Sequence, residues 1–250
     1  MPFTAAHPAI VLPFLNVRYF SATALVIGSI SPDFEYFFQM AVNSRHSHAL
    51  TGVLYFDLPV TFFLGWIFHH VVKKNFIGNL PLFFQRRLQE LLHLKTSSVI
   101  FKRPILFAFS AIIGAASHIF WDGFTHTDTY FTNTLPFYHG AFFPFNGVRY
   151  PLYYALQHIS TYIGLIFITF YLIRLKPSTN ATIQRPQLWY WVMLLTITAV
   201  AVCLRFAVRN SDLEIGNFVV TVISGLCLAV TICGLIKIKA SAVPDIPKHG

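Results

Sequence analysis

The clearest chemistry in the sequence lies in SHIFWDGFTH, residues 117–126. His118, Asp122 and His126 follow one another at four-residue intervals. Residues four apart on a helix are neighbours about 5–6 Å apart at Cβ, so His118 and Asp122 can bind one ion together. His126 lies another turn along and reaches the same ion only if the helix breaks, which Gly123 permits; otherwise it serves a second ion or the substrate. Imidazole with carboxylate suits Zn²⁺, and also Mn²⁺ or Fe²⁺.

The same triplet also has a purely structural interpretation. His118 would hydrogen-bond a neighbouring helix, Asp122 would accept from Trp121 or Ser117, and His126 would be solvated. The residues follow an apolar run, ILFAFSAIIGAA, that is typical of a membrane segment. Ionisable residues in such a segment are costly and mark functional sites by default, which favours ligands over caps.

Other histidines and acids could complete a site with this triplet. They are His7, Asp33, Glu35, His46, His48, Asp57 and His158. Each also has a mundane interpretation when taken singly. Asp33 could cap the helix that follows Pro32, Glu35 could interact with the dipole in its first turn, and Asp57 could cap the next segment. Their chemistry therefore depends on whether the fold brings them together.

Composition indicates an integral membrane protein. Of 250 residues, 55% are hydrophobic and only 11% are charged, against about 25% charged in soluble domains. Apolar runs near the roughly 20 residues needed to cross a bilayer predict an all-α bundle of about five transmembrane helices. The predicted spans are 53–72, 105–121, 152–173, 188–208 and 215–236. We expect two regions: residues 1–175 as a helical membrane domain with the metal site, and residues 176–250 as two further spans with a short tail.

The N-terminal stretch 9–30 is apolar but contains Pro13, Asn16 and Arg18. If it crossed the membrane, His7 and Asp33 would lie on opposite faces and could not share an ion. We therefore predict that it does not cross, but packs along the outer half of the bundle with Arg18 near the headgroups.

Charge placement predicts the orientation of the spans. Thirteen basic residues share one side if the five segments alternate: Lys73, Lys74, Arg86, Arg87, Lys95, Lys102, Arg103, Arg174, Lys176, Arg185, Lys237, Lys239 and Lys248. The positive-inside rule makes that side, and with it the C-terminus, cytoplasmic. The net charge of +9 is thus a topology signal. No nucleic-acid-binding motif accompanies it, so we expect membrane lipids and no nucleic acid as partners.

The acids gather on the opposite side. Seven of the nine fall there: Asp33, Glu35, Asp57, Asp122, Asp128, Asp212 and Glu214. Histidines 46, 48, 126 and 139 share that side, with His118 and His158 within a few turns of it. A chain this poor in acids has concentrated them beside its histidines, which is the main indication of function.

The ordered motifs PFTAAHPA, ALVIGSISPDFEYF, SRHSHALTG, LYFDLP, GAASHIFWDGFTH and YYALQHIS carry a family resemblance. Together they resemble a family of bacterial membrane proteins of unknown function, the DUF4184-like family, over roughly residues 2–175. That family is distantly similar to the YdjM-type membrane-bound metal-dependent hydrolases. Through these it is similar to the zinc-dependent phospholipase C and nuclease P1 group. The resemblance implies a bacterial inner membrane location.

The resemblance also implies a ligand set. The His-x-x-x-Asp pair of the hydrolases falls on His118 and Asp122, an early histidine on His7, a later aspartate on Asp33, and a middle histidine on His46 or His48. The later His-x-x-x-Glu pair is matched only at His158, because Tyr162 stands four residues on. The amino-terminal Trp ligand of the zinc phospholipases is absent. One or two divalent ions, with zinc as first choice, therefore fit better than three.

The function predicted from these features is a metal-dependent hydrolase of a phosphoester or lipid-linked substrate at the non-cytoplasmic face. The metal would lower the pKa of water, and Asp33 or Asp122 would orient that water or accept its proton. Two alternatives stay open. One is a non-catalytic membrane protein that binds metal or serves as a scaffold or transport accessory. The other is a b-type haem protein with His118 and His158 as axial ligands. Protein partners are not indicated.

Overall fold

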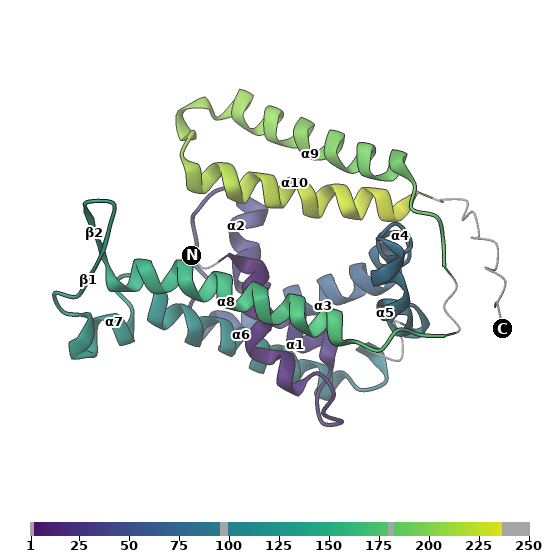
Figure 1. Cartoon of the computed structure of the whole chain (residues 1–250), viewed down its shortest axis with the longest axis horizontal. Helices are drawn as coiled ribbons and strands as arrows, with labels where there is room; N and C mark the ends of the chain where they lie inside the picture. Colours follow the sequence, from purple (N-terminus) through teal and green to yellow (C-terminus); the bar gives the residue numbers. More distant parts are fainter. Residues whose placement is uncertain (1–2, 96–99, 180–182, 237–250) are drawn as a thin grey trace. The chain divides into compact units, whose positions relative to one another are not determined.

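The computed structural model describes residues 3–95, 100–179 and 183–236 (Figure 1). Within them the chain forms two compact units. The first comprises the residues up to 35 together with 44–65 and 103–174, and the second comprises 36–43, 66–102 and the residues from 175 onward. The basic tail residues Lys237, Lys239 and Lys248, and with them the predicted cytoplasmic C-terminus, lie outside the described residues.

The first unit is helical apart from one hairpin. Its elements are η1 (Thr4–Phe14), α1 (Ala22–Gly28), η2 (Ser31–Asp33), η3 (Val53–Asp57), α6 (Pro104–Thr125), α7 (Tyr130–Thr134), η6 (Pro136–Tyr138), β1 (Phe142–Phe145), β2 (Val148–Pro151) and α8 (Leu152–Arg174). Two further helices, α2 (Phe34–Gln39) and α3 (Leu58–Ile67), begin in or beside this unit and end in the other.

Small residues bring α1 and α6 close together. A Cβ added to Gly114 of α6 would lie 2.6 Å from the Leu25 carbonyl oxygen, and one added to Gly28 of α1 would lie 2.5 Å from the Ala111 carbonyl oxygen. Only glycine permits this backbone approach, which is a recurrent way to pack helices in membranes. The Ser21 N–H also donates to Ser110 Oγ at 2.8 Å. Close packing therefore fixes the end of α1 against the side of α6.

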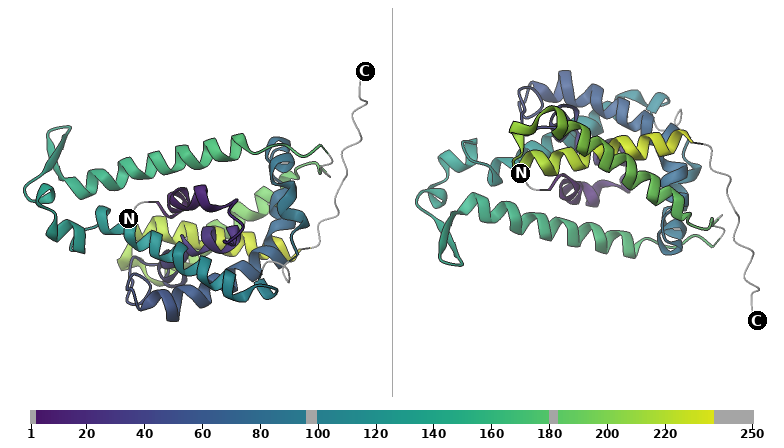
Figure 2. Two further views of the ribbon diagram at one scale, coloured as in Figure 1. Left: turned by 90° about the horizontal axis from the view of Figure 1, so that it is seen from below. Right: turned by 90° about the horizontal axis from the view of Figure 1, so that it is seen from above.

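The N-terminal helix η1 packs against both α6 and α8 (Figure 2). It is a 3₁₀-helix that contains Pro8 and Pro13, which lack the N–H that a regular helix interior needs. Gly164 of α8 leaves room for it, since a Cβ there would lie 3.0 Å from Ala6 Cβ. The Phe3 N–H donates to Thr161 Oγ1 at 3.1 Å, so η1 is anchored at its start.

The chain doubles back within the segment 9–30. The residues on either side of this segment meet, since the Thr4 hydroxyl donates to Asp33 Oδ2. The ends of the N-terminal segment therefore lie together, as the expected pairing of His7 with Asp33 requires. The prediction that this segment packs only along the outer half of the bundle, at the end of α6 that carries His118 and Asp122, does not match this contact pattern. Ser21, just after the turn, is bonded to Ser110 in the first half of α6, away from that end. A 3₁₀-helix rises about 2 Å per residue, so η1 covers more length than an α-helix of equal residue number.

Four helical stretches among the described residues are long and apolar enough to cross a membrane: Pro104–Thr134, Leu152–Arg174, Leu188–Val208 and Ile215–Leu235. They contain or match four of the five predicted spans and indicate a multi-pass membrane protein. The fifth predicted span, 53–72, is helical but includes π-helical turns at η3 and η4 (Phe68–Val72). It also carries Asp57, His69 and His70, which lower its hydropathy.

The hairpin between α7 and α8 was not predicted from the sequence. Its strands pair antiparallel, with Phe145 opposite Val148. Asn146 and Gly147 form the turn with φ of 49° and 77°, the left-handed conformations that two-residue hairpin turns require. Phe142 and Phe145 are exposed on it.

The second unit contains η4, α4 (Lys73–Gly78), α5 (Leu82–His93), α9 (Leu188–Val208), η7 (Asn210–Asp212) and α10 (Ile215–Leu235). Helices α9 and α10 pack around Tyr190, Leu194, Ala229 and Cys233. The Asn75 amide of α4 donates to the carbonyl oxygens of Cys233 and Ile236, each at 2.9 Å, and so satisfies the C-terminal carbonyls of α10.

Candidate metal centre

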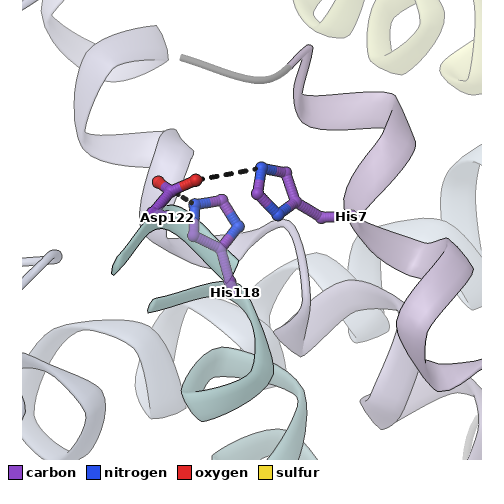
Figure 3. Close-up of side chains that lie close together, drawn as sticks. All are labelled: His7, His118 and Asp122. Carbon is purple, nitrogen blue, oxygen red and sulfur yellow. Dashed lines mark ion pairs between the residues drawn. The ribbon is translucent and has the colours of Figure 1, made fainter. Parts of the chain in front are cut away.

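The last two turns of α6 supply the centre of a buried cluster of histidines and aspartates. His118 is fully buried, and its Nε2 lies 3.2 Å from Asp122 Oδ2 on the next turn (Figure 3). The helix ends at Thr125, and His126 follows in extended conformation with φ −119° and ψ 154°. The break expected near Gly123 therefore falls at His126 itself, which leaves this side chain free to turn back toward Asp122.

The two ring nitrogens of His118 have different surroundings: Nδ1 is hydrogen-bonded to the backbone, and Nε2 is directed into the cluster. Its Nδ1 lies 2.8 Å from the carbonyl oxygen of Ser29, which can only accept, so Nδ1 carries the proton. Nε2 therefore presents a lone pair, and it has no hydrogen-bond partner among the described residues. Metal-ligating histidines are oriented in this way by a backbone carbonyl.

Asp122 does not receive the local hydrogen bonds that a structural role would need. The Trp121 Nε1 donates to Ser160 Oγ at 3.1 Å, and Ser117 Oγ donates to the Gly114 carbonyl at 2.7 Å. Within the described part of the chain, both carboxylate oxygens of Asp122 lack a hydrogen-bond donor although they are buried. Unsatisfied buried carboxylates are rare, so this residue marks a position suited to a cation.

Asp33 and His48 come from connections of the first unit. Asp33 Oδ1 lies 3.5 Å from His118 Nε2 and 3.5 Å from His48 Nε2, while Oδ2 accepts from the Thr4 hydroxyl. His48 Nε2 also lies 3.6 Å from Asp122 Oδ2. Ser44 and Ser47 hydroxyls lie 3.0 Å from its Nδ1 and hold the ring.

The loop that carries His48 is fixed by Glu35. The Glu35 carboxylate accepts from the backbone N–H groups of Arg45, His46 and Ser47 at 2.9, 3.0 and 2.8 Å. Burial raises the pKa of Glu35, but these hydrogen bonds outweigh it and lower the pKa to about 2. Glu35 is therefore ionised at neutral pH and serves the loop, a role that its position in a helical first turn did not reveal.

Four of these atoms form a ring of close neighbours. They are His118 Nε2, Asp122 Oδ2, His48 Nε2 and Asp33 Oδ1, and successive members lie 3.2, 3.6, 3.5 and 3.5 Å apart. Two groups of three residues, Asp33 with His48 and His118, and His7 with His118 and Asp122, offer donor atoms that all lie within 4.8 Å of one another. Neighbouring ligands at about 2.0–2.1 Å from Zn²⁺ would be about 3.4 Å apart, and catalytic sites use three protein ligands. The residues present therefore fit a divalent ion held by three side chains.

His7 and His126 approach the other oxygen of Asp122. His7 Nε2 and His126 Nδ1 each lie 3.6 Å from Asp122 Oδ1. The His7 ring stacks on His118 with centroids 3.7 Å apart, and both of its nitrogens lack hydrogen-bond partners among the described residues. Burial and the neighbouring His118 lower the pKa of His7 to about 3, so it is a neutral imidazole suited to coordination. Asp122 could thus bridge two ion positions, with His126 at the second.

Electrostatics also favour a cation here. Asp33 and Asp122 are both buried and both lie within 3.6 Å of His48. Burial lowers the pKa of His48, but the two carboxylates outweigh that effect and raise it. The cluster thus takes up positive charge, which a proton or a divalent ion can supply.

Two predicted ligands lie outside the cluster. His46 is paired with the Tyr55 hydroxyl at 3.0 Å, and of the two candidates for the middle histidine only His48 joins the cluster. His158 is exposed on α8, with its ring packed against Tyr154 at 4.6 Å. His118 directs its nitrogens to Ser29 and to the carboxylates, so the axial pairing of a haem by His118 and His158 is not formed. The spacing in the sequence cannot show which of His46 and His48 enters the cluster, nor whether His158 on another helix reaches it.

Asp57 is a possible site residue by sequence, with capping of the next segment as its alternative role. Its side chain is fully buried at the end of η3, and both carboxylate oxygens lack hydrogen-bond partners in the described residues. The π-helical turn that places it has no simple sequence signal, although such turns are frequent at functional sites. Asp57 is therefore a further buried carboxylate of this unit that a capping role does not explain.

Comparison with known families assigns the chain to one protein family. The model of the domain of unknown function DUF4184 matches residues 1–235. The protein belongs to this family. No curated protein and no solved structure matches the chain. The match covers α9 and α10 as well as the His–Asp cluster, so it extends beyond the region of the family resemblance, roughly residues 2–175.

Proposed function

We propose that this chain is a membrane-bound, metal-dependent hydrolase of a phosphoester or lipid-linked substrate. The observation that carries the proposal is the set of four neighbouring donor atoms, two imidazole nitrogens and two carboxylate oxygens, from which three residues can hold one ion. This is the donor chemistry of catalytic zinc sites, which keep a position open for water or substrate. The orphaned oxygens of the buried Asp122 support it independently.

The residues of the cluster would have two roles, as metal ligands and as proton acceptors. His118 and His48 would hold the ion through Nε2, with Ser29 and Ser44 fixing the opposite nitrogens. A bound divalent metal supplies Lewis acidity and makes water nucleophilic near neutral pH. Asp33 and Asp122 are the carboxylates that would orient the attacking water and accept its proton, in keeping with their place in the cluster.

The position of the cluster supports a site at the non-cytoplasmic face. It lies at the C-terminal end of α6, whereas Lys102 and Arg103 directly precede that helix. The antiparallel α8 ends at Arg174, on the side of these two residues. By the positive-inside rule we infer that this basic side and the C-terminus are cytoplasmic, in a bacterial inner membrane. Membrane lipids are then the surroundings of the site.

A second candidate is a metal-binding membrane protein without catalysis. It is favoured by the burial of the donors, since His7, Asp33 and His118 are each at most 1% exposed. His48 and His126 retain 23% and 27% of their side-chain exposure, so access to the cluster runs past these two histidines.

The two candidates are separated by metal content and turnover. The full chain, purified in detergent, is loaded with Zn²⁺, Mn²⁺ or Fe²⁺, and bound metal is measured by mass spectrometry. Hydrolysis of bis(p-nitrophenyl) phosphate and of a phospholipid is measured in parallel. We expect at least one bound ion per chain and turnover, both lost in His118→Ala and in Asp122→Ala, with His158→Ala as the control. Unchanged metal stoichiometry in both variants overturns the site, and metal without any turnover favours the second candidate.

A further inference from the structure

Beside the metal cluster, on the other side of Trp121, is an apolar cavity of about 320 Å³. It is open to the surface and is bordered by η1, α6 and α8, and its lining includes Ile10, Phe120, Leu156 and Ile163. Its volume lies in the range of about 300–1,000 Å³ that small-molecule sites occupy. All three elements belong to the first unit, which also holds the cluster.

The lining offers nothing to a polar ligand. The exposed surface of the cavity is apolar throughout. The Ser160 hydroxyl accepts from Trp121 Nε1 at 3.1 Å and donates to the Gln157 carbonyl at 3.2 Å. The Thr125 hydroxyl donates to the Trp121 carbonyl oxygen at 3.5 Å. With these hydroxyls engaged, water or a headgroup in the cavity would go unpaired, whereas a hydrocarbon chain loses nothing.

The cavity is continuous with a surface suited to lipid. Phe120, Ile159 and Ile163 line it and are 53%, 44% and 48% exposed. Further along α8 the exposed residues remain apolar at Ile166 and Phe170. A membrane lipid can therefore enter with its chain from the side, without passing through water.

Trp121 connects the cavity to the metal cluster. Trp121 lines the cavity, and its ring lies edge-on to His7 with centroids 5.5 Å apart. Asp122, the next residue of α6, directs its carboxylate into the cluster. An apolar wall and a cation site thus lie on the same helical turn, which is the arrangement that an amphiphile with an apolar chain and an anionic head requires.

We propose that the cavity between η1, α6 and α8 binds the hydrocarbon chain of a membrane lipid whose phosphorylated head faces the His–Asp cluster. This deepens the proposed function and rests on it for the role of the head. The occupant is one chain of a lipid substrate, and Trp121 divides the part that holds the chain from the part that holds the head. Leu156 and Ile163 would then set which chains fit.

The test uses the full chain in phosphatidylglycerol vesicles that contain a phospholipid with a diazirine in its acyl chain. After illumination, labelled peptides are identified by mass spectrometry. We expect at least threefold more label within 4–14, 118–125 and 156–163 than at Ile166 or Phe170, which are at least as exposed as the cavity residues of α8. Label that follows exposure alone along α8 means ordinary lipid contact and overturns the proposal.

Variants locate the effect. Leu156→Trp fills the cavity and is expected to lower its labelling at least threefold, while Ile166→Trp on the same helix leaves it unchanged. Ile163→Trp is the second filling variant, and size-exclusion chromatography checks the folding of all three. If both filling variants label like the parent chain, the cavity does not bind the lipid.

The two proposals fail separately. His118→Ala is expected to lose metal but keep the cavity label, because the chain is held by apolar contacts alone. Leu156→Trp is expected to keep the bound metal while losing most hydrolysis of the long-chain lipid, whereas Ile166→Trp, outside the cavity, keeps that hydrolysis. Absence of bound metal in the parent chain would remove the hydrolase proposal and leave the labelling result to decide the lipid site.

Discussion

Replacement of Glu35 by glutamine tests how the metal cluster is positioned. The Glu35 carboxylate accepts from three consecutive backbone N–H groups of the loop that carries His48. Glutamine has the same shape but carries no charge. Its carbonyl oxygen can still accept from His46 and Ser47, but its NH₂ group then faces the Arg45 N–H, and two donors oppose each other.

The cost follows from the hydrogen bonds and from the pKa. A hydrogen bond to a charged group contributes about 1.5–3 kcal/mol net, and the substitution loses one and weakens the others. The pKa is lowered from its usual 4.5 to about 2 by these same hydrogen bonds, so the shift expresses the same stabilisation, about 3 kcal/mol at neutral pH. Because the folded-state pKa is the lower one, this stabilisation is complete above about pH 4.5 and lost as the pH falls toward 2. We therefore expect Glu35→Gln to destabilise the loop by about 3 kcal/mol.

The assay measures metal affinity by competition with a fluorescent chelator, and stability by thermal denaturation in detergent. Residues that position metal ligands typically change affinity by about 10–100-fold, and we expect a loss of that size together with a Tm lowered by roughly 5–10 °C. Glu90→Gln, the same substitution at an exposed glutamate of α5, is the matched control. Metal affinity within twofold of the parent, at unchanged Tm, would refute the reasoning and show that His48 is held by its serine contacts alone.

Three further outcomes are expected. Gly114→Val places a branched Cβ 2.6 Å from the Leu25 carbonyl oxygen, so it should lower the free energy of unfolding by about 1–3 kcal/mol or more and weaken metal binding. Ala116→Val, on the exposed side of α6, should change neither the stability nor the metal binding. Equal melting curves for the two variants would contradict this. His46→Ala and His158→Ala should keep the full metal stoichiometry, because neither side chain lies in the cluster, and loss of an ion in either variant would show a different ligand set. Removing metal with a chelator should lower the unfolding free energy by about 2.7 kcal/mol relative to protein at a hundredfold excess of metal over Kd, a difference that adding Zn²⁺ back should restore in denaturation curves.

The membrane helices could be predicted because they depend on local composition. Long apolar runs such as 188–208 and 215–236 have few other ways to fold, and the structure confirms them as helices. The span 53–72 was harder, since Asp57 and two histidines interrupt its apolar pattern and the structure places π-helical turns at both ends of α3. The hairpin at 142–151 has only a short Asn-Gly signal in the sequence.

Sequence also determined the chemistry of the candidate site, since a His-x-x-x-Asp spacing on a helix necessarily brings His118 and Asp122 onto one face. Only the tertiary structure decided which other residues join His118 and Asp122 in the cluster. His7, Asp33 and His48 come from separate segments, and their meeting depends on the close approach of α1 to α6 at glycines and on a loop held by Glu35. His46 and His158, equally plausible by type, lie elsewhere. Local spacing fixes which neighbours on one helix share a face, but contacts between segments far apart in the chain arise from packing, which no single motif encodes.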